Sequence, residues 1–386
     1  MLGKNRLIVD TFSEVSDYLR PWIDREFWEF ANETIIPNAI YVIGRAQSNL
    51  NFEKIQKIVE SGEARVILSN PAEGSETIKW QIFRVGYSDY IKQGRMLMIS
   101  GGDIEPEYHN LPFDSFLGKP YDYDENLESM KRTPKIFDTV EKPYKFLFLN
   151  GRARPNRKFL LESFRLSGLL DQTIWTNLDL FAGKKQEIEI IQDGEDLMLR
   201  TFPIKYLDAK YEVERYHENL SRQPTGTYAK LDLFSNGRSA DWGEIYIKPD
   251  MYIDTYFSLV TETVFCYPYS FRTEKIWKPI AMGHPWIAAA NAGYYRDMHA
   301  LGFRTFGHII DESFDAIDND FERIKRIRDI VEDLCSSQTN LVDFLSAARE
   351  VCEYNQRHLW TMRAQVRNEF GERFRQFLKL NNFIDE

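Results

Sequence analysis

The sequence is poor in cysteine and has no long apolar segment. Its three cysteines, Cys266, Cys335 and Cys352, lack the spacing of a zinc site or a disulfide framework. Buried thiols in a reducing compartment are the simplest interpretation. No apolar run approaches the roughly 20 residues that span a bilayer. The first residues, MLGKNRLIVDTFSE, lack the apolar core of a signal peptide. We therefore expect a cytoplasmic protein without a membrane span.

Several motifs of common enzyme classes are also missing. The sequence contains no GxGxxG, which disfavours a nicotinamide enzyme, and no GxxxxGK[ST], which disfavours a P-loop kinase. GxSxG and HExxH are absent, and the six histidines show no metal-ligand spacing. We therefore expect no metal site and no bound cofactor.

Positive charge is in the minority, with 49 Lys and Arg against 59 Asp and Glu, which gives a net charge of −10. This balance argues against a protein that holds nucleic acid on a general basic surface, although it is compatible with a local basic pocket. Aromatic residues make up 14% of the chain, and loops that bind flat rings or sugars are one use for them.

Short apolar segments alternate with helical patterns over the first 110 residues. Strands are expected at 7–9, 39–44, 65–69 and 95–100. Such alternation predicts a parallel, doubly wound sheet. Residues 105–143 are rich in Pro, Asp and Tyr, and they predict a loop and linker that ends a first domain, 1–140. Asp122 and Asp124 in this linker form a DxD, a metal-binding pattern in some glycosyltransferases, but we favour a solvated acidic linker.

The same alternation resumes after the linker. Strands are expected at 144–149, 257–262, from 286, and at 303–306; helices are expected at 159–170, 294–301, 321–335 and 340–380. We interpret 171–250 as an irregular insertion. Residues 141–340 then form a second Rossmann-like domain, and 341–386 form C-terminal helices for which packing back on the first domain is one arrangement.

A basic loop follows the strand at 144–149. It contains Asn150, Arg152, Arg154, Arg157 and Lys158. A strand, a glycine-bearing turn and a helix start form the geometry that binds phosphate, because free N–H groups and the helix dipole favour an anion. Arginine forks also match phosphate oxygens. The alternative is a solvated basic turn, but the cluster is unusual in an acidic chain.

A second group of charges lies between 257 and 286. Glu262 ends a buried strand, and Thr273, Glu274 and Lys275 open a helix, with Thr273 placed to cap it. Charged residues at the carboxyl end of a strand face the crevice where α/β sheets bind ligands. The alternative is an ion pair between Lys275 and one of the two glutamates.

The segments FSLVTETVF and FRTEKIWKPIAMGHPWI together resemble the donor-binding motif of α-(1,3)-fucosyltransferases. The resemblance extends over about residues 144–310, and the two segments also look like uncharacterised glycosyltransferase-like proteins of bacteria and phages. The positions that match are Glu262, Thr273, Glu274 and Lys275, and Arg157 fits the arginine that meets the donor diphosphate in that family. Thr263 and Arg272 depart from the family pattern, which has Asn and Tyr there.

The resemblance implies an α/β fold of the GT-B type, with two Rossmann-like domains and a cleft between them. It also implies a metal-independent, inverting transfer of a sugar from a GDP- or UDP-linked donor to a saccharide acceptor. Lys275, Arg157 and Arg272 would then meet the donor, and Glu262 would accept hydrogen bonds from sugar hydroxyls. A general base is expected from a strand end of the first domain.

Asp103 and Glu105, after RMLMISGG, are the candidates for that base, with Asp10 in reserve. The alternative for Asp103 is a turn residue that caps the next segment. Two other functions remain open: a glycosyltransferase that acts on modified phage DNA, in the host cytoplasm, and a GT-B-like binding protein without turnover.

Overall fold

The protein is α/β, with two parallel sheets that belong to two compact units of the chain. The computed structural model describes residues 6–9, 15–19, 35–44, 52–74, 78–79, 82–83, 85–118, 135–138, 141–150, 154–177 and 249–385. One unit comprises Met1–Lys119, Tyr269–Thr273 and Trp360–Glu386; the other comprises Pro120–Pro268 and Glu274–Leu359. Below they are called the first and the second unit.

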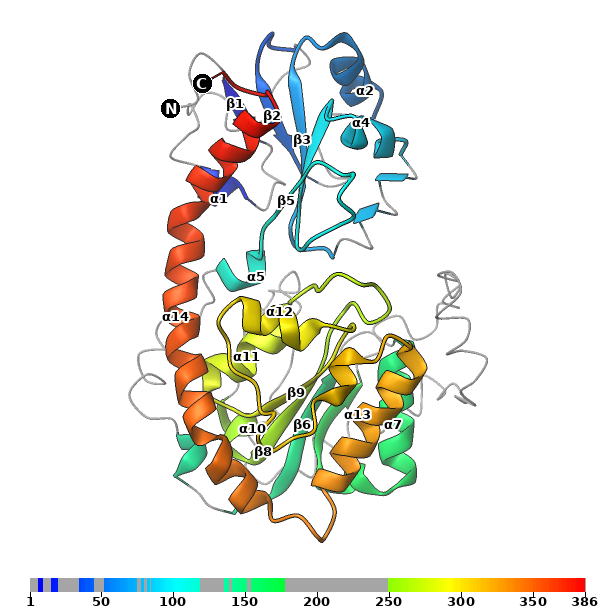
Figure 1. Ribbon diagram of the computed structural model, residues 1–386, viewed down its shortest axis with the longest axis vertical. Coiled ribbons are helices and arrows are strands. Elements are labelled where there is room, and N and C mark those ends of the chain that lie inside the picture. Colours follow the sequence, from blue (N-terminus) through cyan, green and yellow to red (C-terminus); the bar gives the residue numbers. More distant parts are fainter. Residues whose placement is uncertain are drawn as a thin grey trace, which may run out of the picture. The chain divides into compact units, whose positions relative to one another are not determined.

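The sheet of the first unit has five parallel strands in sequential order (Figure 1). They are β1 (Leu7–Val9), β2 (Ile40–Ile43), β3 (Arg65–Asn70), β4 (Met96–Ser100) and β5 (Asn110–Pro112). The helices of this part of the chain are α1 (Ser16–Leu19), α2 (Phe52–Ser61), α4 (Ser88–Lys92) and α5 (Ser115–Gly118). Strands β2 and β4 are buried along their whole length, as expected where helices cover both faces of a parallel sheet.

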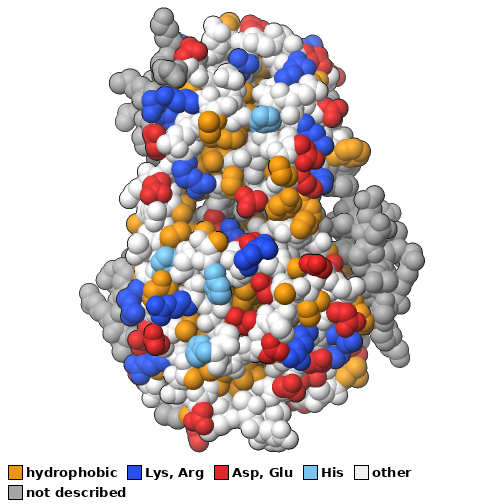
Figure 2. Space-filling view, viewed as in Figure 1, with side chains coloured by type: hydrophobic (Ala, Val, Ile, Leu, Met, Phe, Trp, Pro, Cys, Tyr) orange, Lys and Arg blue, Asp and Glu red, His pale blue; other side chains and the backbone are white. Residues whose placement is uncertain are grey.

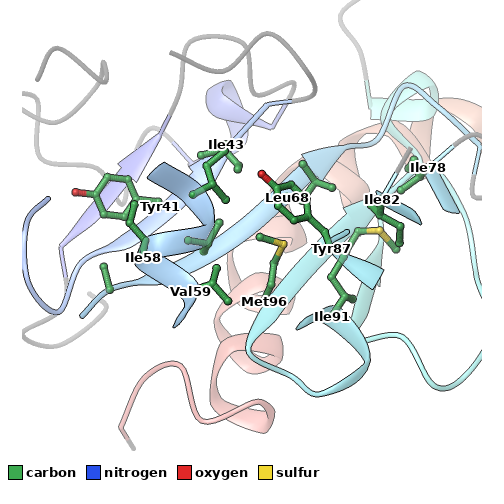
Figure 3. Packing of buried hydrophobic residues seen from close by; sticks show 14 of the residues in the cluster. Tyr41, Ile43, Ile58, Val59, Leu68, Ile78, Ile82, Tyr87, Ile91 and Met96 are labelled. Carbon is green, nitrogen blue, oxygen red and sulfur yellow. The ribbon is translucent and has the colours of Figure 1, made fainter. Parts of the chain in front are cut away.

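Alternate residues of these strands enter two separate apolar cores. Tyr41 and Ile43 of β2 pack in one core with Ile58 of α2 and Ile91 of α4 (Figure 3). Their neighbours, Ile40 and Val42, pack in the other core, which also receives side chains from the last helix of the chain, namely Phe370, Phe374, Phe377 and Leu378. The period of two in a strand separates the faces in this way. The end of the chain thus completes the first unit.

The second unit has a four-stranded parallel sheet in the order β7-β6-β8-β9. The strands are β6 (Tyr144–Asn150), β7 (Ile174–Asn177), β8 (Thr255–Thr261) and β9 (Trp286–Ala289). Its helices are α7 (Pro155–Leu166), α10 (Pro249–Ile253), α11 (Glu274–Met282), α12 (Tyr294–Ala300), α13 (Asp320–Leu334) and the first part of α14 (Leu341–Leu380). Short 3-10 helices lie at Lys135–Phe137, Leu169–Gln172 and Ser313–Ala316. In Figure 1, α7 and α13 lie side by side.

Aromatic side chains fill the core of the second unit. The rings of Phe146 and Phe257, on neighbouring strands, stack with centroids 5.3 Å apart. Phe164 of α7 meets Phe146 edge to face at 5.5 Å, and Phe344 of α14 meets Phe257 at 5.9 Å. These contacts bury the apolar stripes of α7 and α14 on the sheet, which is the main stabilising term for such helices.

Three expected elements differ from the structure. Asn110–Pro112 lies in the segment interpreted as linker, yet it pairs with β4 as an edge strand. Ile174–Asn177 lies in the expected irregular insertion but forms β7 and pairs with β6. Both are short, and both lie beside turn residues, so their patterns are weak. The expected strand at 303–306 is wrong: those residues have no ladder, and Phe303 and Phe306 are buried against Trp277 and Trp286.

The units also divide the chain differently from the expected domains at 140 and 341. The N-terminal segment of the first unit ends at Lys119. Near the C-terminus, the boundary between the two units falls inside α14, between Leu359 and Trp360. A helix can serve two cores because its apolar residues recur every turn. The segment Tyr269–Thr273 is grouped with the first unit, although it lies between β8 and α11 in the sequence.

Candidate functional site

The strand order of the second sheet reverses once, at β6. From β6 the chain passes through α7 to β7 on one side, and β8 then pairs with β6 on the other side. The carboxyl ends of β6 and β8 therefore flank a topological switch point, the position where open α/β sheets bind ligands. The first sheet runs in sequential order and has no such reversal. The topology thus directs attention to the carboxyl edge of the second sheet.

Polar side chains join the ends of β6 and β8. Asn150, the last residue of β6, is buried, and its Oδ1 accepts a hydrogen bond from the hydroxyl of Thr261 at 2.7 Å. Arg157 in the first turn of α7 is also buried. Its Nη2 donates to the carbonyl oxygens of Thr261 at 2.9 Å and Glu262 at 3.3 Å. Asn150 and Arg157 therefore both contact Thr261, the last residue of β8.

Glu262 follows β8 and is completely buried. The hydroxyl of Tyr294 donates to its Oε1 at 3.0 Å, and the N–H of Thr263 donates to its Oε2 at 3.4 Å. The backbone N–H of Glu262 donates to the carbonyl of Ala289 at 3.0 Å. The carboxylate thus holds α12 and the loop after β8 in place. The carboxylate is enclosed by contacts within the protein, whereas the resemblance implied that it accepts hydrogen bonds from sugar hydroxyls.

Glu274 and Lys275 lie at the start of α11. Lys275 Nζ is 2.8 Å from Glu274 Oε1, and it donates to the Thr263 hydroxyl at 3.4 Å. Burial alone would raise the pKa of Glu274, but Lys275 and Lys278 together hold that pKa below its ordinary value. The ion pair considered from the sequence is therefore present. It connects α11 to the loop that begins at Glu262.

Helices α7 and α12 differ in whether a side chain accepts hydrogen bonds from the backbone N–H groups of their first turns. The N-terminus of α12 is capped by Asp315, whose oxygens accept from the N–H groups of Tyr295 at 2.9 Å and Arg296 at 3.2 Å. In α7 the N-cap Arg154 supplies no side-chain cap, and the first turn carries no acidic residue. The dipole of α7 therefore favours an anion, as predicted from the sequence. Lys158 in this turn is half-buried, and Arg152 lies outside the described residues.

Arg272 and Thr273 are grouped with the first unit, one residue before α11 begins. Arg272 Nε lies 2.8 Å from Asp114 Oδ2, and both side chains are largely buried. Thr273 is buried as well. The boundary between the units therefore falls between Thr273 and Glu274, and Glu274 and Lys275 belong to the second unit.

The candidates for the general base follow β4 in the first unit. Asp103 is exposed, whereas the carboxylate of Glu105 forms an ion pair with Lys79. Next to them, the Ser100 hydroxyl contacts the Gly102 carbonyl at 2.6 Å and Asn110 Oδ1 at 2.9 Å. The reserve candidate, Asp10, lies outside the described residues, as do Asp122 and Asp124.

Two residues at the carboxyl edge of the second sheet were not identified from the sequence. Tyr294 and Thr261 complete the hydrogen bonds of Glu262 and Asn150. Thr261 had a usable signal, because polar residues end both β6 and β8. Tyr294 had none, since one aromatic residue at a helix start is ordinary.

The described residues contain no group of three or more His, Cys, Asp or Glu that could hold a metal ion. Burial raises the pKa of the Cys335 thiol to about 12. Among the helices that the structure describes, none has the length and apolar character needed to cross a membrane.

We compared the chain with protein-family models, with curated proteins and with solved structures. None of the three comparisons found a match.

Proposed function

We propose that the protein is a glycosyltransferase of the GT-B type that takes a GDP- or UDP-linked sugar as donor. The observation that carries the proposal is the switch point between β6 and β8, where Asn150, Arg157 and Glu262 meet. Nucleotides and their diphosphates are typical ligands of such a crevice. The resemblance of the two flanking segments to fucosyltransferases narrows the ligand to a nucleotide sugar.

In this proposal the diphosphate lies at the N-terminus of α7. Its negative charge would satisfy N–H groups of a first turn that contains no acidic residue. Lys275 would supply a positive charge from α11, balanced in the free protein by Glu274. Arg157 joins α7 to the end of β8 by a hydrogen bond, and it adds a positive charge in the first turn of the helix. A leaving diphosphate could be neutralised by these groups without a metal.

The acceptor is proposed to be a saccharide. A base takes the proton of an acceptor hydroxyl, the oxygen forms a bond to the anomeric carbon, and the bond from that carbon to the diphosphate breaks. Asp103 and Glu105, which follow β4, are the residues proposed for this base.

The described surface that Figure 2 shows does not favour the alternative of a DNA acceptor. On the face seen in Figure 2, blue and red side chains are interspersed, without a continuous basic stripe. With a net charge of −10, this surface gives little attraction to a polyanion. We propose a cytoplasmic location, since the three cysteines lack the spacing of a disulfide framework, which suits a reducing compartment.

A thermal-shift panel of GDP, UDP, CDP and ADP tests the donor site. A nucleotide at a hundred times its Kd should stabilise the protein by about 2.7 kcal/mol, a shift of roughly a few degrees. Lys275→Ala should abolish the shift, and the matched change Lys278→Ala, one turn further along α11, should retain most of it. The absence of a shift with all four nucleotides would contradict the proposal. Binding without transfer, measured by nucleotide release, would indicate a binding protein instead.

A further inference from the structure

Arg323, on α13, is the most completely enclosed arginine of the described residues. Its side chain is 1% exposed. Neither the sequence motifs nor the donor site uses it, although burying a guanidinium is costly unless its hydrogen bonds are satisfied. The question is what this arginine holds.

All five N–H donors of the guanidinium have acceptors. Nε donates to the Ala290 carbonyl at 3.0 Å, and Nη2 donates to the Phe265 carbonyl at 2.6 Å. Nη1 donates to the carbonyls of Ile317 at 2.7 Å and Asp318 at 3.2 Å. Asp320 accepts the fifth hydrogen bond and balances the charge. Four of the five acceptors are therefore main-chain carbonyls, and they come from three separate loops.

Two of these loops border the candidate site. Phe265 lies three residues after Glu262, and the guanidinium also stacks over its ring at 4.5 Å. Ala290 directly follows Ala289, whose carbonyl accepts from the N–H of Glu262. Arg157 meets the same strand end from the other side, at the carbonyl of Glu262. The end of β8 and the loop after it are thus fixed by guanidinium groups from two helices.

We propose that Arg323 is a positioning residue for the donor site, which fixes the loop from Thr263 to Phe265 and through it the contact of Thr263 with Lys275. The proposal rests on the proposed function for the identity of the ligand. A lysine has three donors on one nitrogen, so it cannot satisfy the five acceptors that the three nitrogens of the guanidinium bind. The shape of the guanidinium, beyond its charge, is therefore the property that the loops require.

Arg323→Lys keeps the charge and its pairing with Asp320 but loses the fork. In the full chain, at a temperature where the variant is folded, its Kd for the nucleotide that the wild type binds should rise at least tenfold. Hydrogen exchange should increase in peptides that contain 263–268. The matched control is Arg326→Lys on the same helix, an exposed arginine that pairs with Asp311, and it should change neither quantity more than twofold.

A lower Tm with an unchanged Kd and unchanged exchange at 263–268 would overturn the proposal, because Arg323 would then only stabilise the fold. If the wild type binds no nucleotide, the proposed function fails separately, and the exchange result alone decides the role of Arg323. If Arg323→Lys does not fold, Asp320→Asn is the substitute, because it removes the charge that pairs with Arg323 while keeping a hydrogen-bond acceptor. It should raise exchange at 263–268 more than Glu322→Gln, which removes a charge from the same helix turn; equal exchange in the two variants would overturn the proposal.

Discussion

The two sheets of this protein are built alike but end differently. Both are parallel, buried and covered by helices, yet only the second reverses its strand order. At the carboxyl edge of the first sheet, Ser100, Asn110 and Gly102 bind one another, and the ring of Phe271 lies against Gly101. At the carboxyl edge of the second sheet, Asn150 of β6 and Arg157 of α7 both form hydrogen bonds with Thr261, the last residue of β8. Polar residues therefore follow strands of both sheets, but the reversal of strand order, which marks the usual ligand position in open α/β sheets, lies in the second sheet.

The largest expected effect separates the units by their response to acid. Burial lowers the pKa of His284 to about 3, against about 6.5 in the unfolded chain. The folded state binds fewer protons between these values, so stability is complete above pH 6.5 and falls as the pH drops toward 3. At about 1.36 kcal/mol per pH unit below 6.5, the loss should reach about 3.4 kcal/mol at pH 4. It belongs to the second unit, where His284 meets Ser258 at 2.9 Å. Urea midpoints from pH 7 to pH 4 measure it.

A matched variant tests this assignment. His284→Gln cannot be protonated, so its stability should be lower at pH 7 and should change less with pH. An equally steep loss in the variant would show that other groups cause the acid sensitivity.

The next effect concerns the carboxyl edge of the first sheet, where Gly101 is closely surrounded by other residues. A Cβ at Gly101 would meet the Phe271 ring and would lie 2.6 Å from the Pro71 carbonyl and 2.9 Å from that of Glu73. Gly101→Ala should therefore destabilise the protein by about 2–3 kcal/mol, measured by urea unfolding, without weakening nucleotide binding. Gly168→Ala in the second unit has a positive φ but open space, so it should cost only about 1 kcal/mol. Equal costs for the two changes would contradict this account of the edge.

A smaller effect is expected at the second edge. Tyr294→Phe removes the hydroxyl that donates to the buried carboxylate of Glu262. The change should cost about 2 kcal/mol of stability and also reduce nucleotide affinity, because the same carboxylate holds the loop toward Lys275. Tyr354→Phe, which removes an exposed hydroxyl bonded to the Gly302 carbonyl at 3.1 Å, is the control. Similar losses in both variants would show that Glu262 has no special dependence on Tyr294.

The smallest effect provides a baseline for these measurements. Arg349 and Glu353 form an exposed pair on α14, with Nε and Oε1 2.8 Å apart. Glu353→Gln should change stability by less than about 0.5 kcal/mol, since exposed pairs of this kind contribute little. A loss above 1 kcal/mol in thermal unfolding would indicate that surface charges matter more in α14 than this spacing implies.

The sequence predicted the strands whose apolar character is continuous. Tyr144–Asn150 and Thr255–Thr261 are examples, because aromatic and β-branched residues in a row favour a buried parallel strand. It did not predict Asn110–Pro112, since a three-residue edge strand has no measurable period. Phe303 and Phe306 gave the opposite error: their apolar character serves packing against tryptophans, with no ladder.

The candidate site was predicted in position more than in detail. Polar residues after apolar strands identified Asn150, Arg157 and Glu262, because the carboxyl edge of a parallel sheet can be read from the order of elements. The complete burial of Glu262 and the grouping of Arg272 with Asp114 could not be read. Both depend on contacts between residues distant in sequence. The burial of Arg323 could not be predicted for the same reason, since a charged residue in an amphipathic helix is normally exposed.

The most direct test of the central claim is to map where a nucleotide binds. Hydrogen exchange of the full chain is measured with and without GDP and UDP, each at saturating concentration. The account predicts protection in peptides from the start of α7, from 262–265 and from the start of α11, with no change in peptides from 100–105. Protection confined to 100–105, or none at any peptide with either nucleotide, would contradict the assignment of the ligand site to the second sheet.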